Sequence, residues 1–189
     1  MKPLEIVAAL LGVLNILLLV RRSVWNYAFG LAMVALYAPV FFHARLYSDA
    51  LLQIIFFAVQ LYGLWNWRRS QAESGEVRIE RLTAIGRLAW AVAGLALIAA
   101  WGGAMARWTD AAFPYLDAAN AIISVIAQIM LSLRLIENWP LWILVDAIAI
   151  GLYIARGLLP TAALYVVMLG MSAWGWIAWR RTLRAEKPA

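Results

Sequence analysis

Two stretches of the chain lie 112 positions apart and nearly repeat each other. Residues 62–69 read Tyr-Gly-Leu-Trp-Asn-Trp-Arg-Arg, and residues 174–181 read Trp-Gly-Trp-Ile-Ala-Trp-Arg-Arg. The same offset, without gaps, also pairs Leu4 with Leu116, Arg22 with Arg134, Asn26 with Asn138, Tyr27 with Trp139 and Ala50 with Ala162. A fixed offset of this kind indicates an internal duplication, so the fold must accommodate two copies of one unit.

The composition requires a lipid bilayer as the solvent. Of the 189 residues, 66% are hydrophobic and 14% are charged, which is more apolar surface than a soluble domain of this length can bury. The formal net charge of +6 suggests nucleic acid as a partner, but the basic residues stand at the ends of apolar runs, where they anchor helices. Because no basic soluble face remains, we expect no nucleic-acid binding. The chain has no cysteine, which excludes disulfides and thiolate catalysis.

Seven apolar segments are long enough to span a bilayer as helices. They cover residues 4–20, 25–43, 49–67, 84–106, 116–134, 139–155 and 160–179. No cleavage site of small residues follows the first segment, so we expect a retained transmembrane helix rather than a signal peptide. The polar stretch at residues 70–81 is expected to be a solvated loop. The sequence therefore predicts an all-α membrane protein with seven transmembrane helices.

The repeat and the helices together predict one integral membrane domain over residues 1–189 with a 3+1+3 layout. The first repeat covers about residues 1–70, the linking helix about 84–106 and the second repeat about 113–182. Three helices end on the face opposite their start, and the linking helix brings the chain back, so both triplets insert in the same direction. Parallel repeats are a transporter architecture, with the substrate site between the repeats near the membrane midplane.

The distribution of lysine and arginine predicts the orientation in the membrane. Twelve of these residues lie on the side of the C-terminus. Four lie on the side of the N-terminus, namely Lys2, Arg45, Arg107 and Arg156. By the positive-inside rule, the C-terminus is cytoplasmic and the N-terminus is outside.

A carboxylate lies within the predicted sixth helix. Asp146 follows Trp139 by seven positions, which places it roughly 10 Å further along the helix axis. A carboxylate at that depth is costly and marks a substrate or ion pathway, unless it is a protonated or internally paired structural acid. Helical spacing puts this acid on one face with Trp139, Trp142 and Tyr153. Indoles and an acid suit a flat aromatic cation, although Trp139 alone also fits an interfacial belt.

Polar side chains follow one face of the predicted fifth helix as well. They are Asp117, Asn120, Ser124 and Gln128. Because lipid contact is costly for amides, Asn120 and Gln128 are expected to face a cavity or to hydrogen-bond a neighbouring helix, and Asp117 is expected to be solvated. The third and seventh helices add polar residues at equivalent positions of the two repeats, Gln53 and Gln60 in one and Tyr165 and Ser172 in the other. Asn15 is expected to join two helices by a hydrogen bond.

Enzyme signatures are absent from the sequence. His43 is the only histidine, which excludes a histidine-ligated metal site. There is no glycine-rich phosphate loop and no nucleophile with a base beside it. We therefore expect no enzymatic activity, no metal and no cofactor, which leaves the transport of a small solute.

Several segments resemble the PnuC family of bacterial vitamin transporters. They are residues 137–142 (Glu-Asn-Trp-Pro-Leu-Trp), 145–146, 151–153 and 164–165, with Gly175 and Trp179, and Tyr62, Gly63 and Trp67 in the first repeat. The resemblance covers nearly the whole chain. It implies a fold similar to the SWEET sugar transporters, a homotrimer in the bacterial inner membrane, and uptake of nicotinamide riboside by facilitated diffusion, with a cytoplasmic kinase trapping the product.

The resemblance also implies binding residues. Nicotinamide riboside transporters of the family carry a Trp-x-x-Trp-x-x-x-Asn pattern, which matches Trp139, Trp142 and Asp146 with an acid in place of the amide. Glutamines of other helices assist in the family, which corresponds to Gln128 and Gln60 here. The polar helix faces described above add Tyr153, Tyr165 and Asn120 to the expected site. An acid suits the pyridinium of nicotinamide riboside and cationic thiamine equally, so both stay candidates, and neutral riboflavin ranks third.

Two further alternatives stay open. A membrane scaffold without a substrate predicts polar faces that satisfy one another and no cavity. A proton carried by Asp146 predicts ion-coupled transport. Across the offset, Trp142 corresponds to Gly30, Asp146 to Val34 and Gln128 to Ile16, so we expect the binding chemistry mainly in the second repeat, with a contribution from the third helix.

Overall fold

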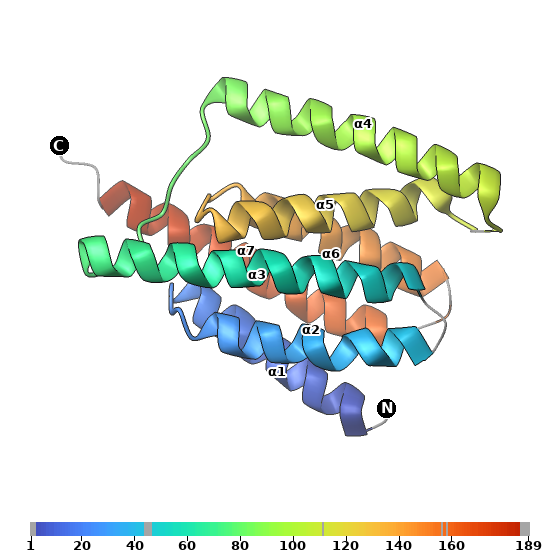
Figure 1. Ribbon diagram of the computed structural model, residues 1–189, viewed down its shortest axis with the longest axis horizontal. Coiled ribbons are helices and arrows are strands. Elements are labelled where there is room, and N and C mark those ends of the chain that lie inside the picture. The colour runs from blue at the N-terminus through green and yellow to red at the C-terminus, as the bar shows by residue number, and fades with distance from the viewer. Residues whose placement is uncertain (1–2, 44–46, 111, 156, 158, 186–189) are drawn as a thin grey trace.

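The computed structural model describes residues 3–43, 47–110, 112–155, 157 and 159–185, which form seven helices. They are α1 (Pro3–Val20), α2 (Asn26–His43), α3 (Tyr47–Ser74), α4 (Ala84–Trp108), α5 (Pro114–Ser132), α6 (Asn138–Ala155) and α7 (Leu159–Ala185). Successive helices run in opposite directions, so α5, α6 and α7 repeat the directions of α1, α2 and α3 (Figure 1). The predicted apolar segments match these helices closely, and α3 and α7 continue past them in polar turns. Of the basic residues that predict the orientation, Lys2, Arg45, Arg156 and Lys187 lie outside the described residues.

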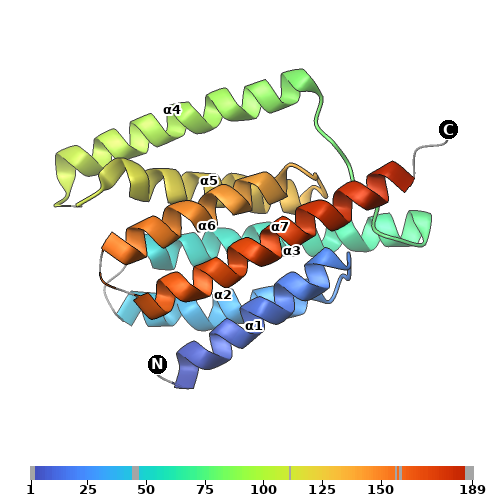
Figure 2. The ribbon, with the colours of Figure 1, turned by 180° about the vertical axis from the view of Figure 1, so that it is seen from behind.

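Six of the helices form a closed ring. α1 packs on α2, α2 on α3, α3 on α5, α5 on α6, α6 on α7, and α7 returns to α1. Among the described elements, α4 contacts α5 alone and lies outside the ring (Figures 1 and 2). Its outward side chains, such as Ile85 and Leu88, are apolar and exposed, as expected for contact with lipid.

Four helical segments in the described part of the chain are long and apolar enough to cross a membrane. They are Ala84–Trp108, Pro114–Ser132, Asn138–Ala155 and Thr161–Ala185. The structure therefore agrees with an all-helical membrane protein, in which the apolar runs form helices because only intrahelical hydrogen bonds satisfy the backbone in lipid.

The turns that join α1 to α2 and α5 to α6 have the same geometry. Arg22 and Arg134 adopt left-handed backbone conformations, with φ of 56° and 63°. In each turn the arginine N–H donates to the carbonyl three residues earlier, and the next N–H donates to the carbonyl five residues before it, at 2.8–2.9 Å. This is a Schellman helix end, at which glycine is the usual residue. Asn26 and Asn138 then begin the next helix in each half, and each donates its side-chain amide to the carbonyl three residues earlier, at 2.7 Å and 2.6 Å.

The offset of 112 residues also relates the contacts of an aromatic cluster. Tyr27 packs edge-on against Trp67 with ring centroids 5.4 Å apart, and Trp139 packs edge-on against Trp179 at 5.5 Å. The indole N–H groups of Trp67 and Trp179 each donate to a backbone carbonyl in the other half of the chain, at 3.1 Å and 3.3 Å. The two halves are thus joined by equivalent side chains.

Residues 70–81 are not the solvated loop that their polarity predicts. α3 continues to Ser74, and residues 75–83 cross the end of the ring with Val77 and Ile79 buried in the aromatic cluster. The backbone of Glu80 pairs with the α5–α6 turn through two hydrogen bonds of 2.9 Å and 3.0 Å. The prediction is wrong because the two apolar residues alternate with charged ones, so the overall polarity of the stretch conceals a strand-like pattern with one buried face.

We call residues 75–83 the strap, and the end of the ring that they cross the strap face. Ion pairs join the strap to both turns: Arg22 pairs with Glu76 at 3.0 Å, and Arg134 pairs with Glu80. The carboxylate of Glu137 accepts hydrogen bonds from the Leu82 N–H at 3.3 Å and pairs with Arg87 at 2.9 Å. The opposite face is the end at which α1, α3, α5 and α7 begin.

Candidate functional site

A cavity of about 450 Å³ lies inside the six-helix ring. Each ring helix contributes to its wall, and α4 does not. All eight side chains that the sequence predicts for the site line this cavity: Trp142, Asp146, Trp139, Gln128, Tyr153, Tyr165, Gln60 and Asn120. The volume falls within the roughly 300–1,000 Å³ of small-molecule pockets. A scaffold without a substrate predicts no such space.

Asp146 is the acidic group of the cavity wall. Its side chain is 5% exposed, and its Oδ2 accepts a hydrogen bond of 2.9 Å from the hydroxyl of Ser172 on the adjacent α7. Within the described residues, no lysine or arginine lines the cavity or pairs with this carboxylate. An ionised carboxylate accepts several hydrogen bonds, so Asp146 can still bind a cationic ligand. Asp146 is therefore not paired with a basic side chain of the described residues, as an internally paired structural acid would be.

The two indoles of α6 occupy different places. Trp139 is 1% exposed, and its ring fills the space above Gly175, where a side chain would overlap it. Its Nε1 has no hydrogen-bond partner among the described residues. Trp142 lies about one turn further along α6, is half-buried and lines the cavity wall. Trp139 therefore forms the floor of the cavity at the strap face, and Trp142 is the indole placed to stack on a ligand.

Amide side chains line the part of the cavity formed by the first half of the chain. A side chain at Gly30 would overlap the amide oxygen of Gln60 and the amide nitrogen of Asn15. Asn15 also donates to the backbone oxygen of Asn26 at 2.8 Å, which is the predicted hydrogen bond between helices. Gly30 precedes Trp142 by the same offset of 112 residues. The wall therefore has amide side chains over a glycine on α2 and an indole at the corresponding position of α6.

Two tyrosines and an asparagine lie towards the opposite face. The rings of Tyr153 on α6 and Tyr165 on α7 are 5.2 Å apart between centroids. Asn120 on α5 accepts at its backbone oxygen a hydrogen bond of 2.7 Å from the hydroxyl of Ser124. The side-chain Oδ1 of Asn120 is buried and has no hydrogen-bond partner among the described residues.

Several further wall residues carry no charge and were not predicted from the sequence. They are Met33, Tyr37, Phe56, Thr161, Leu164 and Met168. On α2, the spacing of Asn26, Gly30, Met33 and Tyr37 follows one helix face, which was the available signal. Apolar side chains inside a spanning helix fit lipid and a cavity wall equally well, so this signal does not distinguish the two.

Comparison with known proteins identifies the family. The family described as nicotinamide mononucleotide transporter matches residues 2–181. The nicotinamide riboside transporter PnuC of Neisseria mucosa is 31% identical over 94% of this chain and 72% of its own length. PnuC of Escherichia coli is 26% identical over 96% of this chain and 86% of its own length. The riboflavin/roseoflavin transporter RibM of Streptomyces davaonensis is 28% identical, with coverages of 97% and 88%.

A solved structure has the same fold. The crystal structure of the vitamin B3 transporter PnuC matches with a TM-score of 0.80, covering 97% of this chain and 83% of that chain at 28% identity. The matching relatives are transporters, which confirms the expectation of a non-enzymatic protein. The chain belongs to the PnuC family of bacterial vitamin transporters and is a multi-pass protein of the inner membrane.

Proposed function

We propose that this chain carries nicotinamide riboside across the membrane by facilitated diffusion. The observation that carries the proposal is the cavity inside the ring, where an indole, two buried glutamines and a carboxylate with no basic partner among the described residues surround one space. The similarity to two transporters named for nicotinamide riboside supports the same substrate.

The chemistry of the substrate matches that of the wall. Nicotinamide riboside has a flat pyridinium cation, a carboxamide and a ribose. Trp142 stacks on the pyridinium and contributes a cation–π attraction, and Asp146 offsets the positive charge. Gln128 and Gln60 bind the carboxamide or the ribose. The tyrosine pair and Asn120 complete the pocket, and Trp139 bounds it at the strap face.

The proposed mechanism requires no energy source in the transporter itself. Facilitated diffusion ends when the concentrations on both sides are equal, so a cytoplasmic kinase must trap the product by phosphorylation. Uptake into sealed vesicles is expected to be indifferent to proton and sodium gradients. Stimulation by either gradient would instead assign ion coupling, with Asp146 as the candidate proton carrier.

We further propose that all seven helices span the membrane as two parallel, SWEET-like triplets joined by α4. The matched turns, the matched aromatic pairs and the equal helix directions support this arrangement. The excess of arginine supports a cytoplasmic strap face and an outer opposite face. Family resemblance favours a homotrimer, which a mass measurement in detergent tests.

The site assignment is tested by uptake of labelled nicotinamide riboside into vesicles that contain the purified protein. Trp142→Ala is expected to lower uptake at low substrate concentration by about tenfold or more, because a desolvated cation–π contact contributes about 2 kcal/mol. Asp146→Ala is expected to have a similar effect, because it removes the carboxylate that offsets the charge of the substrate. Trp25→Ala is the matched control, because this indole is 73% exposed and lies outside the cavity. Wild-type rates in both cavity variants would refute the site.

A second candidate is thiamine, or less favourably riboflavin, in the same cavity. Asp146 stands where nicotinamide riboside transporters of the family have an amide, and RibM, named for riboflavin, is a relative of similar identity. Unlabelled thiamine and riboflavin are therefore tested as competitors of nicotinamide riboside. Asp146→Asn installs the amide of the nicotinamide riboside transporters, so it is expected to retain binding of nicotinamide riboside, to weaken binding of cationic thiamine and to leave riboflavin unaffected. The tightest competitor identifies the substrate.

A further inference from the structure

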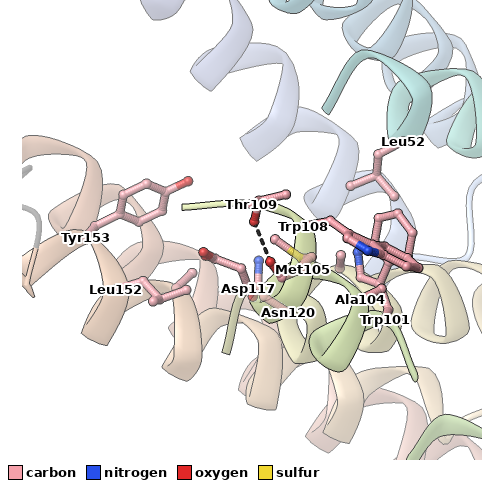
Figure 3. A pocket seen from close by; sticks show the side chains of 12 residues that line it. Leu52, Trp101, Ala104, Met105, Trp108, Thr109, Asp117, Asn120, Leu152 and Tyr153 are labelled. Carbon is pink, nitrogen blue, oxygen red and sulfur yellow. Dashed lines mark hydrogen bonds between the residues drawn. The ribbon is translucent and has the colours of Figure 1, made fainter. Parts of the chain in front are cut away.

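A second cavity, of about 430 Å³, adjoins the cavity inside the ring (Figure 3). α4, α5 and α6 supply nearly all of its wall. Leu52, Asn120 and Tyr153 line both cavities. These three side chains therefore lie between the two cavities. A ligand that moves from one cavity to the other must pass them.

One face of α4 borders the second cavity. Its side chains follow helical spacing, at Trp101, Ala104, Met105 and Trp108. α4 is held close to α5 here, because a side chain at Gly102 would overlap the ring of Tyr115. At the end of α4, the hydroxyl of Thr109 donates to the backbone oxygen of Met105 at 2.7 Å (Figure 3). A helix that lies outside the ring thus has a defined position beside this space.

The wall repeats the chemistry of the central cavity. Trp101 and Trp108 supply two indoles that are 48% and 77% exposed, and Asp117 supplies a carboxylate. Figure 3 shows Asp117 and Asn120 between Tyr153 on one side and the two tryptophans on the other. Anchoring at a membrane interface explains either indole singly, but it does not explain their joint position on one cavity wall with a carboxylate.

Asn120 connects the two sites chemically. Its Oδ1 is buried without a hydrogen-bond partner among the described residues, although buried polar atoms are normally satisfied. The residue borders both cavities, so a rotation of its side chain would present this oxygen to a donor group on a ligand in either one. The cavity lies where α4 ends and α5 begins, at the opposite face, which the proposed orientation places outside.

We propose that the second cavity is a loading site that binds a flat aromatic cation and passes it to the central cavity by way of Asn120 and Tyr153. The inference rests on the proposed function and names a further binding site for the same chemical class of substrate. It also assigns a binding role to α4, which contributes nothing to the central cavity.

Equilibrium dialysis of the purified protein against labelled nicotinamide riboside, and separately against labelled thiamine, tests the number of sites. The wild-type protein is expected to bind two molecules per protomer, the loading site being the weaker. The double variant Trp101→Leu, Asp117→Asn is expected to bind one, with the affinity of the tighter site unchanged. Trp142→Ala is expected to lose the tighter site and to retain the weaker one, and Trp25→Leu is the control.

Uptake kinetics test whether the second site loads the first. Asp117→Asn, which conserves the shape of the side chain, and Trp101→Leu are expected to raise the KM for uptake about threefold to tenfold, with the maximal rate near the wild-type value. A single site in the wild-type protein, or a wild-type KM in both variants, would overturn the loading site while leaving the proposed function intact. Wild-type uptake in Trp142→Ala would overturn the central site, and failure to bind either vitamin would overturn both proposals.

Discussion

The indoles of Trp67 and Trp179 meet at the strap face with ring centroids 6.1 Å apart, although 112 residues separate them in the chain. Both are almost fully buried, and each is packed edge-on by an aromatic ring of its own half. Val77 and Ile79 of the strap belong to the same cluster. The aromatic cluster at the strap face is therefore built by residues 112 positions apart together with the segment that connects the two halves, and its Trp139 also lines the cavity.

The fit of the aromatic cluster depends on glycine at position 175. Gly175→Ala is expected to lower the free energy of unfolding by about 1–3 kcal/mol, because the added methyl group overlaps the ring of Trp139. Thermal unfolding in detergent measures the change. Gly170→Ala, on the same helix with nothing within 4 Å of the added carbon, is expected to be neutral or stabilising, because alanine has the higher helix propensity. Equal losses in both variants would contradict the packing argument.

Gly30 is expected to control the amide side of the cavity. In Gly30→Ala the methyl group overlaps the ends of two flexible side chains, Gln60 and Asn15, so these move and the backbone does not. The displaced amides no longer meet the substrate, and we expect the KM for uptake to rise about threefold to tenfold, the value of one hydrogen bond. Gly151→Ala, which meets nothing within 4 Å, serves as the control. An unchanged KM in Gly30→Ala would exclude Gln60 from binding.

The strap is expected to behave as part of the core. Ile79→Ala should lower the free energy of unfolding by about 2–5 kcal/mol, because Ile79 is 6% exposed in the aromatic cluster. Limited digestion with trypsin, which cleaves after Arg78 and Arg81, should also be faster in this variant. Leu88→Ala, at an exposed position on α4, is the control for the loss of an apolar side chain. A solvated loop would instead give the same stability and cleavage rate in wild type and Ile79→Ala.

The orientation can be measured directly because the chain has no cysteine of its own. Glu73→Cys places one thiol at an exposed position near the strap face, and Asp110→Cys places one at an exposed position near the opposite face. A membrane-impermeant maleimide applied to intact cells is expected to label position 110 and to label position 73 only after permeabilisation. The reverse pattern would invert the proposed orientation.

The helices and eight wall residues of the cavity could be predicted from the order of amino acids alone. Apolar runs predicted the seven helices because a backbone in lipid has no alternative partner for its hydrogen bonds. The eight predicted site residues line one cavity, because polar groups such as Asp146 and Gln128 are too costly to face lipid and must point inwards. Their role in binding stays a prediction.

The identity of the helices that close the ring, and the place of each side chain on the cavity wall, follow from contacts between distant parts of the chain. Helices in lipid do not associate through burial of an apolar stripe, so the hydropathy of α4 does not indicate that it lies outside the ring. Trp139 and Trp142 lie on the same face of α6. Trp139 packs against Gly175 at the strap face, whereas Trp142 lines the side of the cavity. The burial of the strap could not be predicted either, because Val77 and Ile79 pack against residues from distant parts of the chain. Contacts of this kind depend on shape and proximity in three dimensions, which the order of residues along the chain does not display.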